Sequence, residues 1–245
     1  MFVHYRTRGI IIDQKDRGEF DQLFTIFTRE FGKLEIIGKA IRKASSKLRQ
    51  GAAPFYLTEI EFIQGKSQKT LTDAVLIEKF VSIRKDLEKL KWAFQIGETL
   101  DGLVRGQEPD EKIWQLLLKT LERLDGLSLS GDSERVEILY RYFFWNLLTI
   151  LGYRPELYYC SVCRKKLAPA NNYFDFKEGG AVCPDCAGKK ADELSPETIK
   201  ILRVILGAKP ETLFRLRGIE ERCFKELKSI SEKYYLSLCE NLSSF

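Results

Sequence analysis

The chain has 245 residues, of which 44% are hydrophobic and 12% aromatic, and it carries a formal net charge of +5 at pH 7. This composition supports one large or two modest folded domains and excludes a disordered chain. The longest apolar stretch, residues 143–151, is too short to cross a bilayer. The first residues lack a signal-peptide pattern, so we expect a cytoplasmic protein without a membrane segment.

The first 80 residues show the pattern of a small β-barrel. We expect one strand that ends near Ile12 and further strands at residues 23–28, 34–37, 56–62 and 70–77. In the fourth, apolar and charged residues alternate, as in a half-buried strand. Five short strands favour a barrel of the OB type, although the spacing alone also fits an SH3-like barrel.

From about residue 80 the apolar residues follow a helical period. We expect helices from residue 83 to 94, from an N-cap at Asp110 to residue 124, and from Ser133 to a stop at Gly152. Two more begin at Ser195-Pro196 and near residue 218. The fold class is therefore α+β, with a barrel at residues 1–80 and a helical domain at 81–245 that carries an insertion at about 156–192.

Four cysteines define this insertion, in the pattern Cys160-x-x-Cys163 and Cys183-x-x-Cys186, with 19 residues between the pairs. This spacing predicts a structural Zn²⁺ site, because two short loops can bring four thiolates to one point. Disulfides would need an oxidising compartment, and a redox motif would need only one pair. Iron remains an alternative metal for four sulfurs.

The sequence lacks the residues and motifs on which several kinds of catalysis depend. The sequence has no P-loop, no G-x-G-x-x-G motif, no clustered acidic pair, and a single histidine, His4. We therefore expect no catalytic site and no ATPase, nuclease or zinc hydrolase activity. A binding or strand-handling protein is the favoured class.

Positive charge is concentrated in the first third of the chain. Residues 1–80 contain 14 Lys/Arg and 10 Asp/Glu, a balance of +4, whereas residues 81–150 contain 10 and 12, a balance of −2. A basic run from Lys39 to Arg49 has no acidic residue between Glu35 and Glu59. Such a run permits a nucleic-acid partner without requiring one.

Five segments in chain order carry a resemblance to a known family: Tyr5–Ile11, Gly18–Leu23, Phe27–Lys33, Ser46–Leu48 and Leu151–Pro155. Over nearly its whole length the chain resembles the bacterial RecO family of recombination mediators and DNA repair proteins, in its zinc-bearing form. One departure is Ala40, where the family usually has a glycine, and the change affects the backbone at the start of the basic run.

The resemblance implies an OB-fold, a helical domain and a zinc module in a bacterial, nucleoid-associated protein without catalytic residues. It also implies binding of single- and double-stranded DNA, annealing of complementary strands, and partnership with RecR. Finally, it implies contact with the C-terminal tail of single-stranded DNA-binding protein and help in loading RecA in the RecF pathway.

The expected phosphate contacts are six cations: Lys33, Lys39, Arg42, Lys43, Lys47 and Arg49. The alternative is a solvated surface loop, because charge runs are common. Phe24, Phe55 and Tyr56 are candidates for base stacking, although a strand aromatic more often belongs to the core.

A second hypothesis is a protein adaptor without DNA binding. It would hold an acidic peptide in a pocket rimmed by cations, with four arginines near the late helices as candidates: Arg203, Arg215, Arg217 and Arg222. A transcription regulator is a weaker third hypothesis, because no recognition-helix motif stands out.

Overall fold

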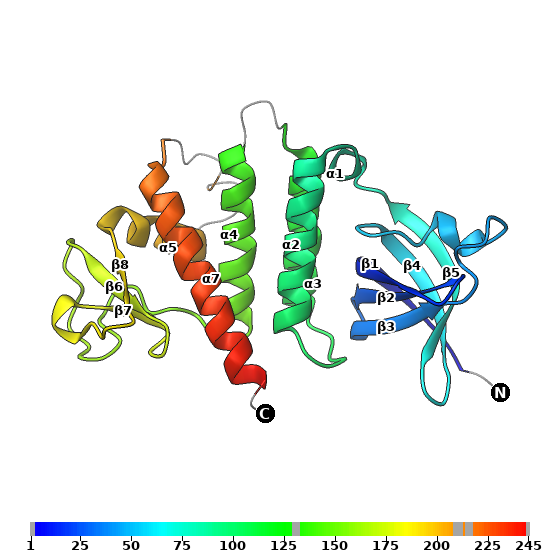
Figure 1. Cartoon of the computed structure of the whole chain (residues 1–245), viewed down its shortest axis with the longest axis horizontal. Helices are drawn as coiled ribbons and strands as arrows, with labels where there is room; N and C mark the ends of the chain where they lie inside the picture. Colours follow the sequence, from blue (N-terminus) through cyan, green and yellow to red (C-terminus); the bar gives the residue numbers. More distant parts are fainter. Residues whose placement is uncertain (1–2, 129–132, 208–212, 214–217, 244–245) are drawn as a thin grey trace. The chain divides into compact units, whose positions relative to one another are not determined.

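The computed structural model describes residues 3–128, 133–207, 213 and 218–243. Contacts divide the chain into two compact units, residues 1–132 and 133–245. Among the described residues, the first contains the barrel and helices α1, α2 and α3, and the second contains helices α4, α5 and α7 and a small sheet (Figure 1). Among the described residues, none of the helices is long and apolar enough to span a membrane.

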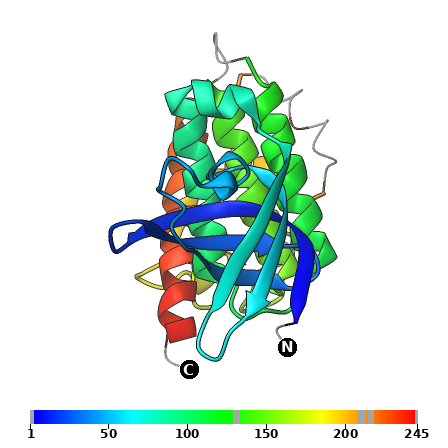
Figure 2. The same ribbon diagram turned by 90° about the vertical axis from the view of Figure 1, so that its right-hand side faces the viewer.

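Five strands close into a barrel in the order β1-β2-β3-β5-β4 (Figure 2). They are β1 (His4–Arg17), β2 (Asp21–Thr28), β3 (Gly32–Gly38), β4 (Leu57–Gln64) and β5 (Lys69–Glu78). The pairs are antiparallel except β3 with β5, which run parallel and share two residue pairs. The OB-type barrel expected from the sequence is confirmed.

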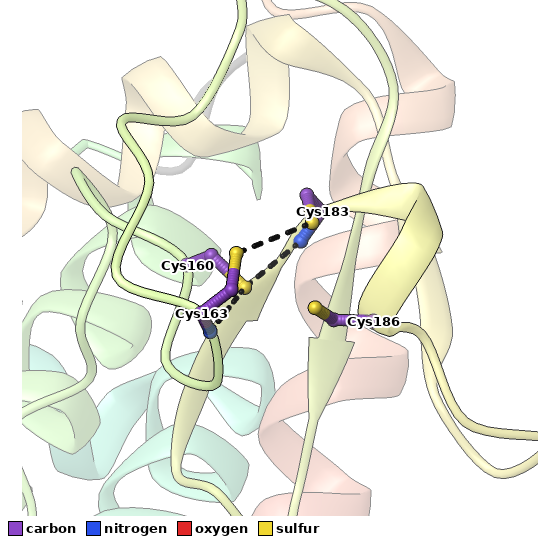
Figure 3. A group of neighbouring side chains, drawn as sticks. All are labelled: Cys160, Cys163, Cys183 and Cys186. Atoms are coloured by element: carbon purple, nitrogen blue, oxygen red, sulfur yellow. Dashed lines mark hydrogen bonds between the residues drawn. The ribbon is translucent and has the colours of Figure 1, made fainter.

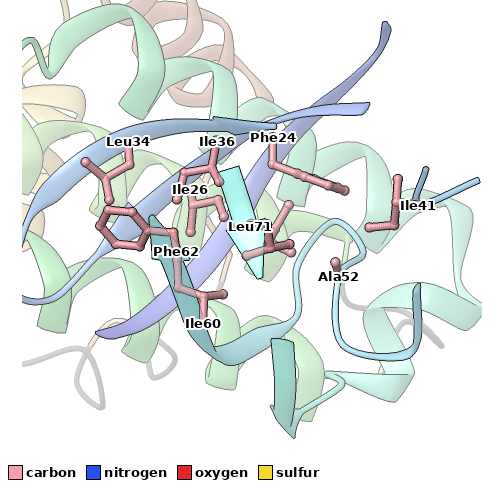
Figure 4. Packing of buried hydrophobic residues seen from close by; sticks show 10 residues of the cluster. Phe24, Ile26, Leu34, Ile36, Ile41, Ala52, Ile60, Phe62 and Leu71 are labelled. Carbon is pink, nitrogen blue, oxygen red and sulfur yellow. The ribbon is translucent and has the colours of Figure 1, made fainter. Parts of the chain in front are cut away.

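The barrel interior is filled by the apolar residues of the alternating pattern. In β4, Thr58, Ile60 and Phe62 are buried, whereas Glu59 and Glu61 are partly exposed. Figure 4 shows the side chains that meet inside: Phe24, Ile26, Leu34, Ile36, Ile41, Ala52, Ile60, Phe62 and Leu71. Ile41 and Ala52 come from the connection between β3 and β4, so this connection is anchored at both ends by buried residues.

The first strand is longer than expected. It does not end near Ile12 but continues to Arg17, after a register shift between Ile11 and Asp13. Residues 13–17 pair with residues 21–25 as a hairpin arm that projects from the barrel (Figure 2). The prediction was wrong because none of residues 13–17 is buried, so this end of β1 is polar and charged and shows no apolar alternation.

Three helices complete the first unit: α1 (Val81–Lys85), α2 (Leu87–Leu103) and α3 (Glu111–Gly126). The Asp110 carboxylate accepts hydrogen bonds from two backbone N–H groups of the first turn of α3, which confirms the expected cap. Helix α2 packs closely on β1 at Gly97, where a Cβ atom would lie 2.8 Å from the Ile12 carbonyl oxygen. Strands give way to helices near residue 80, yet the barrel and these helices form one compact unit.

The second unit contains α4 (Ser133–Ile150), α5 (Pro196–Gly207) and α7 (Glu221–Ser243). Helix α4 ends just before Gly152, whose φ of +91° suits glycine. A three-stranded antiparallel sheet in the order β7-β6-β8 lies between α4 and α5 in the chain. Its strands are β6 (Asn172–Asp175), β7 (Gly180–Val182) and β8 (Asp192–Leu194).

Candidate metal centre and nucleic-acid interface

The four cysteines come together in the second unit (Figure 3). Cys160 and Cys163 lie on the loop before β6, Cys183 directly follows β7, and Cys186 ends a short 3₁₀ turn. The first loop is closed by two backbone hydrogen bonds: the Arg164 N–H donates to the Cys160 carbonyl, and the Cys160 N–H donates to that of Lys165. Each pair therefore curls as the spacing predicts.

The sulfur positions suit a four-coordinate ion. All four Sγ atoms lie within 4.8 Å of one another, and those of Cys163 and Cys183 are 3.8 Å apart. Sulfurs at about 2.3 Å from a tetrahedral Zn²⁺ would be about 3.8 Å apart. The cluster can therefore hold a metal ion, with protein ligands in all four positions.

The protonation of the thiols reflects their crowding. Burial of Cys160 opposes ionisation, but backbone N–H groups of Cys163, Cys183 and Val162 outweigh it and lower the Cys160 pKa to about 6. Hydrogen bonding with Cys183, together with burial, raises the Cys186 pKa to about 12. Protein groups alone thus favour one thiolate and oppose another, and a cation would supply the charge that four thiolates need.

The cysteine module is fastened to the helices of its unit by an aromatic cluster and an ion pair. Phe174 of β6 contacts Trp145 of α4 and Tyr234 of α7, with ring centroids 6.0 and 5.4 Å away. Lys233 Nζ lies 2.7 Å from Asp192 of β8. The module therefore shares a core with α4 and α7, and Cys223 of α7 is buried as well.

The connection between β3 and β4 carries five of the six predicted DNA contacts: Lys39, Arg42, Lys43, Lys47 and Arg49. We call residues 39–50 the basic loop. All five cations are exposed, and Lys47 and Arg49 lie on a 3₁₀ turn, Lys47–Gln50. The loop itself contains no acidic residue.

Lys33 lies apart from this loop, on β3. Its Nζ is bonded to Asp101 of α2, 2.7 Å from the carbonyl oxygen and 2.9 Å from the carboxylate. Its side chain is only 18% exposed. Lys33 therefore fastens the barrel to α2, and no sequence pattern indicates a partner 68 positions away.

Two of the three predicted stacking aromatics belong to the core. Phe24 and Phe55 are 0% and 1% exposed. Tyr56 is half-buried beneath Arg84, whose guanidinium carbon lies 4.8 Å from the ring centroid. The exposed aromatic beside the basic loop is Phe20, which sequence reasoning missed although an aromatic residue in a charged turn was a visible signal.

Ala40 adopts the left-handed conformation that a glycine would favour, with a φ of +51°. Its N–H donates a 2.7 Å hydrogen bond to the Asp21 carboxylate. The substitution at the start of the basic loop therefore leaves the backbone in a glycine-type conformation.

A cavity of about 230 Å³ lies in the second unit beside Arg203, one of the predicted cationic rim residues. Arg154, Leu157, Tyr158 and Leu206 also line it. Arg203 donates to the Leu157 carbonyl and stacks on Tyr158 at 4.4 Å. Among the other candidates, Arg222 pairs with Glu226 at 2.7 Å, and Arg215 and Arg217 lie outside the described residues.

The chain combines an OB-type barrel, a set of helices and a four-cysteine cluster that can hold a metal ion. Two family models match the chain: recombination protein O N terminal at residues 1–80 and recombination protein O C terminal at residues 84–241. The chain belongs to the recombination protein O (RecO) family.

The names of curated relatives are consistent with membership of this family. A protein named DNA repair protein RecO from Dehalococcoides mccartyi strain 195 is 32% identical over 91% of this chain and 86% of its own length. The protein of the same name from Syntrophomonas wolfei is 34% identical over 94% of this chain and 89% of its own length. That from Roseiflexus sp. strain RS-1 is 32% identical over 96% and 81%.

Proposed function

We propose that this protein acts in DNA repair and homologous recombination as a non-enzymatic mediator that binds single- and double-stranded DNA and anneals complementary strands. The observation that carries the proposal is the basic loop, whose five exposed cations extend from an OB-type barrel. The family and the names of the relatives support the same role.

The loop binds a strand through its phosphates. Each phosphate that a Lys or Arg neutralises releases a condensed counterion, and this release favours binding most strongly at low salt. Because the cations contact the backbone, the base edges stay free. Two strands held this way repel each other less, and their bases remain able to pair.

The cysteine cluster holds a structural Zn²⁺ ion in this proposal. Four thiolates match the preference of zinc, and a closed tetrahedral site leaves no position for water activation. The ion orders the module that packs on α4 and α7 through Phe174. It stabilises the second unit and takes no part in DNA contacts.

The test is a salt titration of binding to a labelled, unstructured single strand, measured by fluorescence anisotropy. With about four phosphates neutralised, the slope of log K against log salt is expected near −3. Arg42→Glu with Lys43→Glu should weaken binding and annealing strongly. Lys112→Glu with Lys119→Glu, an equal charge reversal at exposed positions of α3, should cost much less. Equal effects of the two double variants would contradict the assignment.

A second role, as an adaptor, is favoured by the cavity beside Arg203. Two arginines, Arg154 and Arg203, and two leucines, Leu157 and Leu206, line a space of about 230 Å³. This lining suits an acidic peptide that ends in an apolar residue, such as the C-terminal tail of single-stranded DNA-binding protein. Partnership with RecR and assistance to RecA on coated DNA belong to the same proposal.

The adaptor role predicts that a peptide of that chemistry binds without DNA. Arg154→Glu should weaken its binding, whereas Arg222→Glu, a charge reversal on α7 outside the cavity, should not. The DNA affinity of Arg154→Glu separates the two roles, because the basic loop is unchanged in that variant.

A further inference from the structure

The turn between β1 and β2 presents an aromatic ring beside the basic loop. This turn consists of residues 18–20, and Phe20 at its end is 40% exposed. The ring stands out among the barrel phenylalanines, because Phe24, Phe27 and Phe62 are each at most 2% exposed. Neither the phosphate contacts nor the barrel core uses Phe20.

Two contacts tie Phe20 to the cationic residues. Its carbonyl oxygen accepts a 3.0 Å hydrogen bond from the Arg42 N–H, so the turn and the basic loop are joined through their backbones. The Lys43 ammonium lies 5.1 Å from the centroid of the Phe20 ring. An aromatic ring with an adjacent cation is the pairing that binds single-stranded nucleic acid, because the ring stacks on a base while the cation holds a phosphate.

Three acidic residues also lie near the turn, and two of them already have a bonding partner within the protein. Asp16 pairs with Arg42 at 3.1 Å, and Asp21 accepts the hydrogen bond from the Ala40 N–H. Glu19 is exposed next to Phe20. Against these stand the exposed Lys39, Arg42 and Lys43, with the rest of the basic loop beyond them. Residues 16–21 and 39–50 together carry six cations and three acidic residues, so the surroundings of the ring are cationic on balance.

We propose that Phe20 is a stacking platform for a base of the single strand whose phosphates bind the basic loop. This inference rests on the proposed DNA binding and adds a base contact to it. Lys43 covers one face of the ring. A base stacks on the other face, or it displaces the Lys43 ammonium, which then binds a phosphate. Every base has a π-face, so the contact favours single strands without reading sequence.

The experiment compares two ligands that share their phosphates: a labelled thymidine oligonucleotide and an abasic oligonucleotide of the same length. Phe20→Leu keeps an apolar side chain and removes the ring, and it should weaken binding of the thymidine strand about tenfold. It should leave the abasic strand within about twofold of wild type. Phe20→Trp retains a stacking face and should bind the thymidine strand at least as tightly as wild type.

A spectroscopic measurement keeps the test independent of affinity. The indole of Phe20→Trp should be quenched by the thymidine strand and not by the abasic strand, after subtraction of the wild-type signal. An equal loss on both strands in Phe20→Leu, or no loss on either, would overturn the base contact while the basic loop keeps its role. If wild type binds neither strand at low salt, the base contact and the proposed DNA binding both fail.

Discussion

The four-cysteine cluster and the basic loop each depend on a few residues, but they arrange the functional groups of these residues in opposite ways. In the metal centre four sulfurs converge within 4.8 Å, and each is one of only four donors. In the basic loop five cations spread into solvent, and each would contribute one phosphate contact among several. A convergent site should therefore fail when one residue changes, whereas a dispersed site should weaken by steps.

The largest expected effect tests the convergent site. Cys183→Ser should lose the metal and lower the free energy of unfolding of the second unit by roughly 3–5 kcal/mol, because three sulfurs cannot close the coordination shell. Elemental analysis and urea denaturation measure the two quantities. Cys239→Ser, which changes a cysteine outside the quartet, should keep one metal per chain.

The same variant also tests whether the two regions are independent. Binding of single-stranded DNA by the barrel should survive in Cys183→Ser below its unfolding transition. A loss of DNA affinity in step with the loss of metal would show that the cysteine module takes part in binding.

A smaller effect is expected at the start of the basic loop. Ala40→Gly should stabilise the first unit by about 1 kcal/mol, because glycine occupies a positive φ without the strain that a Cβ atom brings. Thermal denaturation measures the change. Ala44→Gly is the control, since Ala44 lies in the same loop without a positive φ, and it should be neutral or slightly destabilising.

The dispersed site should also respond to removal of a competing charge. Asp16→Asn releases Arg42 from its 3.1 Å ion pair and should raise the affinity for single-stranded DNA about two- to fivefold. The salt slope should become steeper as well. Glu122→Gln, the same charge change at an exposed position of α3, should raise affinity less. Equal gains would mean that only net charge matters.

The smallest effect at neutral pH concerns the core that supports the metal centre. Burial raises the pKa of the Tyr234 phenol, and Tyr153 raises it further. Because the folded-state pKa lies above the unfolded value of about 10, the folded chain keeps a proton that the unfolded chain loses. The contribution of the Tyr234 phenol to the free energy of unfolding is thus fully present below pH about 10 and decreases as pH rises beyond it.

Tyr234→Phe should therefore cost less than about 1 kcal/mol at pH 7, since the Tyr234 hydroxyl donates only a long hydrogen bond of 3.5 Å. It should become the more stable protein above pH about 10. Urea denaturation across that range measures both. Tyr173→Phe removes a phenol from β6 in the same unit, and a similar reversal there would contradict the assignment to Tyr234.

Sequence reasoning succeeded where residue spacing determines geometry. The cysteine pairs indicated that four sulfurs lie close enough to hold one metal ion, and alternation in residues 56–62 indicated which face of β4 is buried. The alternation in β4 depends on residues that are close together in the chain, and the cysteine cluster depends on a fixed set of four sulfur ligands. The predicted boundary at residue 80, between a barrel domain and a helical domain, stays a prediction.

Sequence reasoning could not reveal contacts that join distant positions. Lys33 was predicted as a phosphate contact, and the structure pairs it with Asp101 of α2. Phe24 was a stacking candidate, and the closed barrel buries it. Phe20, in a charged turn, lies beside Lys43 only because the hairpin arm brings β1 and β2 to the basic loop. Charge and aromaticity can be read from sequence, but exposure depends on the closed fold.

The first strand has a consequence for the newly synthesised chain. Residues 4–10 pair with residues 57–63, so the second partner of β1 leaves the ribosome roughly 2–10 s later at the usual rate of synthesis. During that interval the edge of β1 is open to other chains, and charged side chains on an edge oppose such pairing. Arg6 and Arg8 alternate along this edge and are exposed. Their charge would oppose pairing with other chains until β4 arrives, and in the folded barrel Arg6 forms an ion pair with Glu59.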